Sequence, residues 1–237
     1  MNIKKILKTR EDALYYDICE YKENCNSWVG GNAPKILDNI SFPNMEKYYF
    51  YLTLQSPLNK ERQYSIFTPD FDTSLEYNSY PNCKVLLIEH EISEQSNCTK
   101  FKHPEIDDIY SLYEIGEDRD GPEKNNVIKF GGKAIPIQWG LDNDGKVTKD
   151  GYDFIFQINE IGMRGISEFM SGSIYVYGKI ENENIENIQV NDNQENITSL
   201  CNITPTWGEL IKKTFNNFIN CISKLFSSNK ENVKNND

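Results

Sequence analysis

The feature that most constrains the fold is a pattern that occurs twice along the chain. In segments 28–34 and 129–136, an aromatic or aliphatic residue precedes a Gly-Gly pair, and a proline follows the pair. Each is followed by an aromatic, strand-forming segment with a glutamine near its end, at 49–55 and 153–158. The second glycine and the glutamine are 24 residues apart in the first copy and 25 in the second. We therefore predict an internal duplication.

The paired glycines, Gly30 with Gly31 and Gly131 with Gly132, suit a sharp turn with positive φ, because glycine has no Cβ to clash. A phosphate cradle is the alternative interpretation. However, neither pair belongs to a G-x-G-x-x-G or P-loop motif. We expect both pairs to be structural turns.

Gln55 and Gln157 each lie inside a strongly apolar segment, where an amide needs hydrogen bonds to neighbouring backbone. We expect both to be buried structural residues rather than ligand contacts. The two repeats then extend over about 28–70 and 129–180, within a single domain at 1–203.

Helical patterns are found near both ends of the chain. Apolar residues recur at close to helical spacing from 2 to 21. Segment 206–209 has the form of a capping box, and apolar residues follow it at spacings of three and four. We predict an N-terminal helix, an amphipathic helix at 204–226 and a disordered tail at 227–237. The expected fold class is α+β, with duplicated antiparallel β-sheet units and N-terminal and C-terminal helices.

The charge is acidic and unevenly distributed. Lysine and arginine number 25 against 36 acids, a net charge of -11, and residues 105–123 alone hold eight acids and one arginine. This balance repels nucleic acids and anionic membranes, so neither is predicted as a partner. Residues 117–120 are interpreted as a solvated acidic loop within segment 105–123. Its candidate residues for binding a protein partner are Glu114, Glu117, Asp118, Asp120 and Glu123.

Catalytic and metal-binding signatures are weak. The chain has two histidines, His90 and His103, and in the strand predicted at 84–91 the acids on either side of His90 point to the opposite face. Segment 142–145 lacks the acids that a calcium loop needs and is predicted to be a tight turn between strands. Neither catalysis, nor a cofactor, nor a metal is predicted.

The start of the chain lacks the continuous apolar stretch of a secretory signal, and nowhere do 18 apolar residues run together. We therefore predict a cytoplasmic protein without a transmembrane segment. The sequence leaves the oligomeric state open.

The order of motifs in the second repeat resembles that of the bacterial YwqG-like family. The resemblance is carried by the segments 130–132, 135–139, 142–145, 154–159 and 172–177. Family-motif positions are Gly131, Gly132, Pro136, Trp139, Gln157 and Gly172, with Gly30, Gly31 and Gln55 as counterparts in the first repeat.

The resemblance implies a duplicated α+β fold, no established enzyme activity and a frequent association with polymorphic toxin genes. It implies an immunity protein that neutralises a cognate toxin, and the acidic segment favours a basic toxin domain as that partner. Two alternatives stay open. One is a small-ligand or nucleotide-binding protein that uses the Gly-Gly turns, and the other is a hydrolase that uses carboxylates such as Glu89, Glu91 or Asp120.

Overall fold

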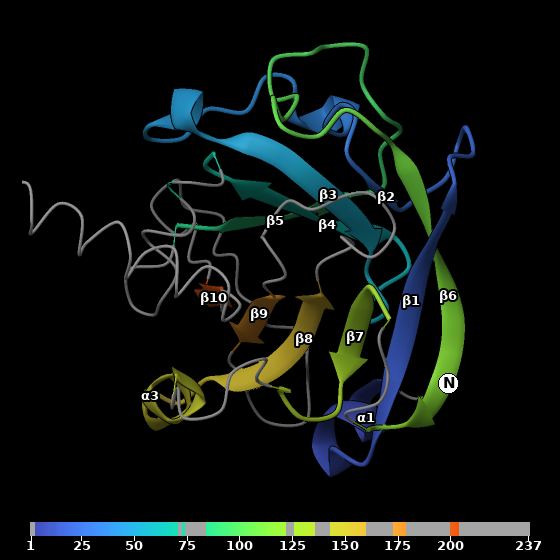
Figure 1. Cartoon of the computed structure of the whole chain (residues 1–237), viewed down its shortest axis with the longest axis vertical. Coiled ribbons are helices and arrows are strands. Elements are labelled where there is room, and N and C mark those ends of the chain that lie inside the picture. The colour runs from blue at the N-terminus through green and yellow to red at the C-terminus, as the bar shows by residue number, and fades with distance from the viewer. Residues whose placement is uncertain are drawn as a thin grey trace, which may run out of the picture.

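The computed structural model describes residues 3–70, 73, 84–121, 126–135, 143–159, 173–178 and 200–203. Over these residues the protein is mostly β and is built on one curled antiparallel sheet (Figure 1). The predicted α+β class is therefore wrong. The segments 204–226 and 227–237, predicted as a helix and a tail, lie outside the described residues. Of the helices in the described part of the chain, none is long and apolar enough to cross a membrane.

The N-terminal segment forms a short helix and then a strand, where one helix was predicted. Helix α1 (Ile3–Thr9) is followed by Arg10, whose φ of 59° is left-handed and ends the helix. Strand β1 (Asp12–Glu20) comes next, and its side chains from Ala13 to Ile18 are all buried. Because both faces of β1 are covered, its apolar residues do not alternate, which is why sequence periodicity did not reveal the strand.

The sheet has ten strands in the order β10-β9-β8-β7-β1-β6-β2-β3-β4-β5, with every pairing antiparallel. The first half of the chain supplies β1 and then β2 (Trp28–Val29), β3 (Tyr49–Gln55), β4 (Arg62–Thr68) and β5 (Leu86–Glu91). The second half supplies β6 (Tyr110–Arg119), β7 (Ile128–Gly131), β8 (Asp153–Asn159), β9 (Ser173–Gly178) and β10 (Leu200–Ile203). The acidic loop predicted at 117–120 is thus mostly the end of strand β6.

The strand order is pseudo-symmetric about the central β1–β6 pair. Outward from β6 come β2 to β5, and outward from β1 come β7 to β10. The first strand of each half therefore pairs with strands of the other half: β1 lies beside β7, and β6 lies beside β2. Matching irregularities occur as well: the β3–β4 register shifts between Phe50 and Leu52, and the β8–β9 register shifts between Phe154 and Phe156.

The strand pairings also show which residues correspond between the halves. Trp28 of β2 pairs with Thr53, whereas Lys129 of β7 pairs with Gln157. Gln157 therefore corresponds to Thr53 in the first half and not to Gln55, so the sequence comparison misplaced this residue by two positions.

The largest core lies on the inner face of the curled sheet and joins both halves. Its buried side chains include Leu14, Tyr16, Leu52, Tyr64, Phe130 and Phe156. Because successive strand residues alternate between faces, the two other clusters lie on the outer face.

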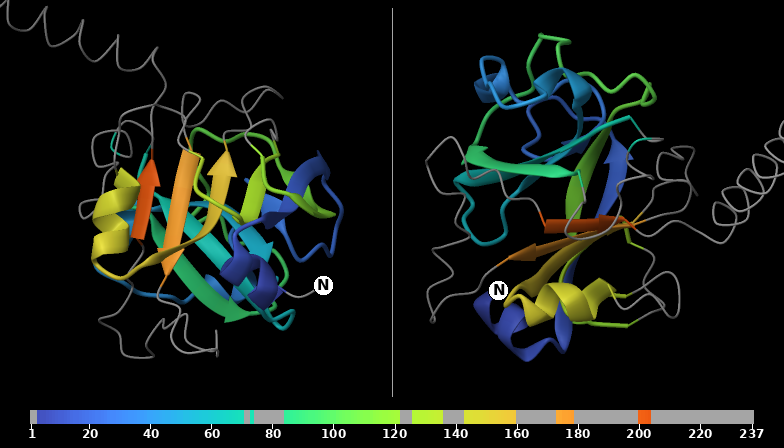
Figure 2. Two further views of the ribbon diagram at one scale, coloured as in Figure 1. Left: turned by 90° about the horizontal axis from the view of Figure 1, so that it is seen from below. Right: turned by 90° about the vertical axis from the view of Figure 1, so that its left-hand side faces the viewer.

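Two short helical segments and one helix contribute to the cover of the outer face. Around η1 (Lys35–Leu37) and η2 (Met45–Lys47), Leu37 and Phe42 belong to a cluster with Phe50 and Phe67. Helix α3 (Asn143–Lys149) lies beside β8 and β9 and packs Val147 in a cluster with Phe154 and Tyr177 (Figure 2). The tight turn predicted over 142–145 is wrong, because its residues from Asn143 onward begin this helix.

Candidate functional site

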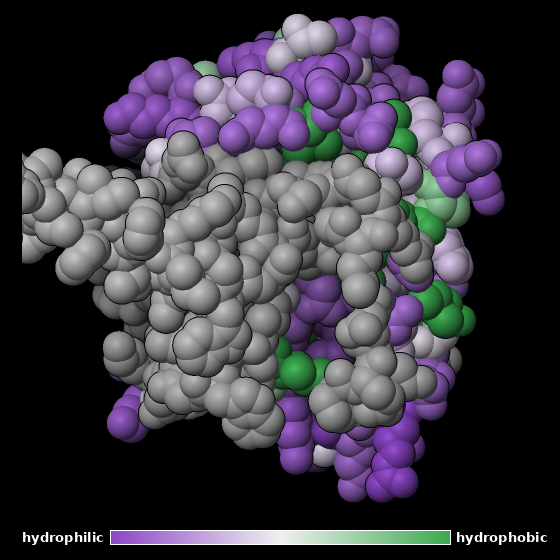
Figure 3. All heavy atoms as spheres, in the orientation of Figure 1, coloured by the Kyte–Doolittle hydropathy of each residue, from purple (hydrophilic) through white to green (hydrophobic). Residues whose placement is uncertain are grey.

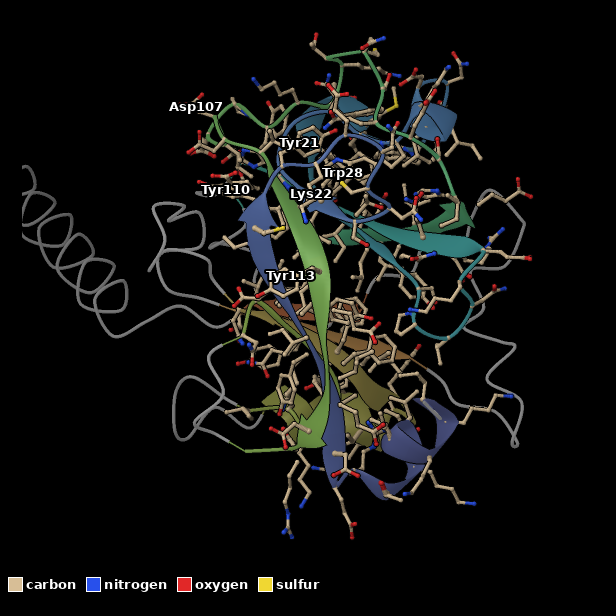
Figure 4. All side chains as sticks on the ribbon, turned by 90° about the vertical axis from the view of Figure 1, so that its right-hand side faces the viewer. Tyr21, Lys22, Trp28, Asp107, Tyr110 and Tyr113 are labelled. Atoms are coloured by element: carbon tan, nitrogen blue, oxygen red, sulfur yellow. The ribbon has the colours of Figure 1, made fainter. Side chains whose placement is uncertain are left out.

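The outward side of β6 carries exposed apolar and acidic side chains together. Tyr113 and Ile115 are 46% and 51% exposed, which is unusual for large hydrophobic residues in the middle of a sheet. Glu117 and Asp118 follow them and are also exposed. Asp118 pairs with Ala13 and points outward, whereas Glu117 pairs with Leu14 and points to the inner side of the sheet. We name these four residues the β6 surface. Figure 4 shows Tyr113 on the outward side of β6, and Figure 3 shows apolar atoms breaking the hydrophilic surface along the margin where this strand runs.

One edge of β6 is partly unpaired. Along its whole length β6 pairs with β1. On the other edge, β2 pairs with it at Tyr110 and Ser111, and the amide of Leu112 donates to the Ser27 carbonyl at 2.9 Å. Beyond Leu112, the described residues place no strand on that edge. The backbone groups there that point away from β1 have no strand partner among the described residues.

A β-bulge interrupts the same stretch. Tyr16 pairs with Glu114 and Tyr15 pairs with Gly116, which leaves Ile115 as the extra residue in β6. Gly116 has a φ of 133°, a conformation that glycine adopts without strain. The bulge thus contributes to the outward exposure of Ile115.

Glu114 is exposed but already has partners within the protein. Its Oε2 lies 3.3 Å from Lys60 Nζ and accepts a hydrogen bond from the Tyr16 hydroxyl at 3.5 Å. Burial, together with the neighbouring Glu114 carboxylate, raises the pKa of Tyr16. Glu114 therefore lies at the rim of the β6 surface.

Asp120, also predicted to contact a partner, belongs instead to a buried network. Its Oδ1 lies 3.1 Å from Lys129 Nζ, and the exposed fractions of the two side chains are 9% and 3%. The Lys133 amide and the Tyr15 hydroxyl also donate to this carboxylate, at 2.8 Å and 3.2 Å. Burial lowers the pKa of Lys129, and Asp120 partly offsets this effect. The structure thus separates Asp120 from Glu117 and Asp118, and Glu123 lies outside the described residues.

The Gly-Gly turns are packed against the protein's own chain. Gly30 and Gly131 have φ values of 72° and 83°. A Cβ at Gly30 would lie 2.2 Å from the Asp108 carbonyl oxygen, and one at Gly131 would lie 2.3 Å from Cγ2 of Ile6. A Cβ at Gly31 would lie 2.6 Å from Gln95 Nε2, and one at Gly132 would lie 2.5 Å from Asp120 Oδ2. These contacts account for the glycines by close packing.

The two glutamines lie in different environments. Gln157 is 3% exposed, and its amide accepts from the Ile135 N–H at 3.1 Å and donates to the Ile135 carbonyl at 3.3 Å. Gln55 is half-buried and donates to the Lys60 carbonyl at 2.7 Å. Both amides therefore hold loops in place, although only Gln157 is buried. The motif residues Pro136, Trp139 and Gly172 lie outside the described residues.

A buried serine–histidine pair was not found from the sequence. Ser65 Oγ lies 2.8 Å from His90 Nε2, and His90 Nδ1 lies 2.7 Å from the Glu91 carbonyl oxygen. A carbonyl only accepts, so Nδ1 carries the proton and Nε2 accepts from Ser65. Burial lowers the pKa of His90, which favours this neutral ring. Ser65 is 0% exposed, so no substrate reaches its hydroxyl in this conformation. No local sequence pattern indicates this pair, because 25 residues separate its members.

The remaining candidate carboxylates do not converge. Glu89 forms an ion pair with Arg62 at 3.3 Å, and His90 and Glu91 follow it on alternating faces of β5. Within the ranges that the structure describes, no group of three or more His, Cys, Asp or Glu residues is arranged to hold a metal ion.

Comparison with known proteins adds no relative. No protein-family model matches the chain, and no curated protein matches it significantly. The resemblance to the YwqG-like family therefore stays a prediction, and function must be argued from the residues themselves.

Proposed function

We propose that this protein is a non-catalytic binding module that covers a basic protein partner with its β6 surface. The observation that carries the proposal is the exposure of Tyr113 and Ile115 beside the carboxylates of Glu117 and Asp118. Protein interfaces commonly have an apolar, aromatic centre and a polar rim. The β6 surface has this composition on a small scale.

Charge supports a basic partner. Glu105, Asp107 and Asp108 are exposed in the segment that leads into β6, and Figure 4 places Asp107 near the start of that strand. The whole chain has a net charge of -11. Such a surface steers a positively charged protein into contact and raises the association rate, while it repels nucleic acids.

In its specific form, the proposal is that the protein is a cytoplasmic immunity protein whose partner is a basic toxin domain. Inhibition of a toxin requires a complementary surface and no chemistry of its own. The ligand-binding alternative has less support, because protein atoms occupy the space beside Gly30 and Gly131 where a phosphate would approach. The hydrolase alternative also has less support, because Glu89 and Asp120 are held in ion pairs.

The test is to recover the partner from the source strain and titrate it with purified variants. Replacing Glu117→Lys and Asp118→Lys together reverses the charge of the β6 surface. Replacing Glu46→Lys and Asp150→Lys changes the net charge equally at two exposed positions elsewhere. We expect the first variant to bind at least about tenfold more weakly and the second to bind within about twofold of the wild type, since each tenfold corresponds to about 1.4 kcal/mol. Equal affinities of the two variants would contradict the proposal.

A further inference from the structure

We infer that the partner binds by adding an extended, basic segment as a new strand along the unpaired edge of β6. This inference rests on the proposed function and specifies how the β6 surface is used. The edge extends from Tyr113 to Arg119, beyond the point where β2 leaves β6. That length is comparable to the strands of the sheet itself, such as β3 and β4.

The direction of the backbone groups on this edge follows from the hydrogen bonds at its two ends. The Leu112 amide points toward β2, and the Asp120 amide donates to the Glu11 carbonyl on the β1 side at 2.9 Å. Backbone groups alternate along a strand, with the bulge at Ile115 taking up one residue. The amide and carbonyl of Glu114 and Glu117 therefore point away from β1. They present donors and acceptors to an incoming strand.

The negative charge of this edge favours a basic segment over a second copy of the chain. A second copy of this chain on the same edge would place Glu117 and Asp118 near their own counterparts, and like charges on paired strands are destabilising. Exposed charges and a bulge are also the usual means by which natural sheets prevent edges from pairing with each other. A segment that alternates lysine or arginine with apolar residues avoids this repulsion between like charges. Its cations, all on one face, meet Glu114 and Glu117, and its apolar side chains, on the other face, cover Tyr113 and Ile115.

The test uses a synthetic heptapeptide of alternating lysine and valine, because it carries the required chemistry without the unidentified partner. A second peptide has the same sequence with N-methyl groups on alternate residues, which removes the backbone donors along one edge and keeps the charge. A third peptide has glutamate in place of lysine. Binding is followed by calorimetric titration, and hydrogen exchange is measured on the amides of residues 112–119 in the full-length protein.

We expect saturable binding of the lysine peptide, slower amide exchange between Glu114 and Arg119, and at least about tenfold weaker binding of both control peptides. If the N-methylated peptide binds equally well and exchange is unchanged, charge attraction alone is at work and strand addition is overturned. If no lysine peptide binds, or if Glu117→Lys with Asp118→Lys leaves its binding unchanged, strand addition is also overturned. None of these results depends on the partner titration, so the two proposals fail separately.

Discussion

Lys129 occupies in the second half of the sheet the place that Trp28 occupies in the first. Trp28 Nε1 donates to the carbonyl of Asn32 at 3.1 Å, and Lys129 Nζ donates to the carbonyl of Lys133. In each case the bond crosses a Gly-Gly turn and reaches the residue four positions ahead. Both side chains are almost fully buried. The shared arrangement supports the predicted duplication, with an indole and an ammonium group fixing equivalent loops.

The ammonium group of Lys129 requires a counter-charge that the Trp28 indole does not. Asp120 supplies it, so Asp120→Asn should lower the free energy of unfolding by about 3 kcal/mol, because it leaves a buried cation without its partner. Asp118→Asn, on an exposed side chain of β6, should change it by less than about 0.5 kcal/mol. Urea denaturation of both variants measures the difference, and similar stabilities would show that the Asp120–Lys129 pair is not buried in solution.

A second prediction concerns the first Gly-Gly turn. Gly30→Ala should cost at least about 3 kcal/mol, because the new methyl group meets the Asp108 backbone carbonyl, which cannot move aside easily. Gly151 has a similar positive φ of 80°, but in the described part of the chain no heavy atom beyond its own neighbours lies within 4 Å of its Cβ position. Gly151→Ala should therefore cost only the conformational penalty of about 1 kcal/mol. If thermal and urea unfolding show equal losses, close packing is not the reason for Gly30.

Some of the strands could be predicted from the sequence, but β1 was predicted as helix and the way the strands are assembled could not be predicted. Aromatic and β-branched residues indicated β3, β4, β8 and β9, which the structure confirms. The central β1–β6 pair, which joins the two halves, depends on pairings between distant residues, such as Asp17 with Tyr113. No local pattern encodes such pairings.

The candidate site was predicted only in part, for a similar reason. The acidic composition of β6 is visible in the sequence, and Glu117 and Asp118 are exposed as expected. Whether a carboxylate is exposed or neutralised depends on which cation the fold brings near it. Asp120, just after β6, is neutralised by Lys129, nine residues further on in β7. The exposure of Tyr113 and Ile115 also depends on where β2 leaves the edge of β6.

A third prediction tests whether the Ser65–His90 pair is structural. Ser65→Ala should destabilise the protein by about 1–3 kcal/mol, because the buried His90 Nε2 loses its hydrogen-bond donor. A fluorophosphonate probe of serine hydrolases should not label native Ser65, which is fully buried. Labelling that disappears in Ser65→Ala would instead show that the Ser65 hydroxyl is accessible and nucleophilic, which contradicts a purely structural role.

A fourth prediction concerns acid stability and His103, which packs against the Tyr49 ring and is 1% exposed. Burial lowers the pKa of His103 from 6.5 to about 4, although Asp70 nearby acts in the opposite direction. The unfolded chain therefore binds a proton at a higher pH than the folded protein does. The stabilisation is fully present above about pH 6.5 and is lost as the pH falls toward 4, by about 3 kcal/mol in all.

The variant His103→Asn isolates this effect, because its side-chain oxygen can replace the Nδ1 acceptor that receives the Glu105 amide at 3.2 Å. Its free energy of unfolding should fall less steeply between pH 6.5 and 4 than that of the wild type, by up to one proton per molecule. The buried His90 also has a lowered pKa and is present in both proteins, so its contribution cancels in the comparison. Parallel stability curves for the two proteins over this range would mean that His103 titrates normally and is accessible to water in the folded state.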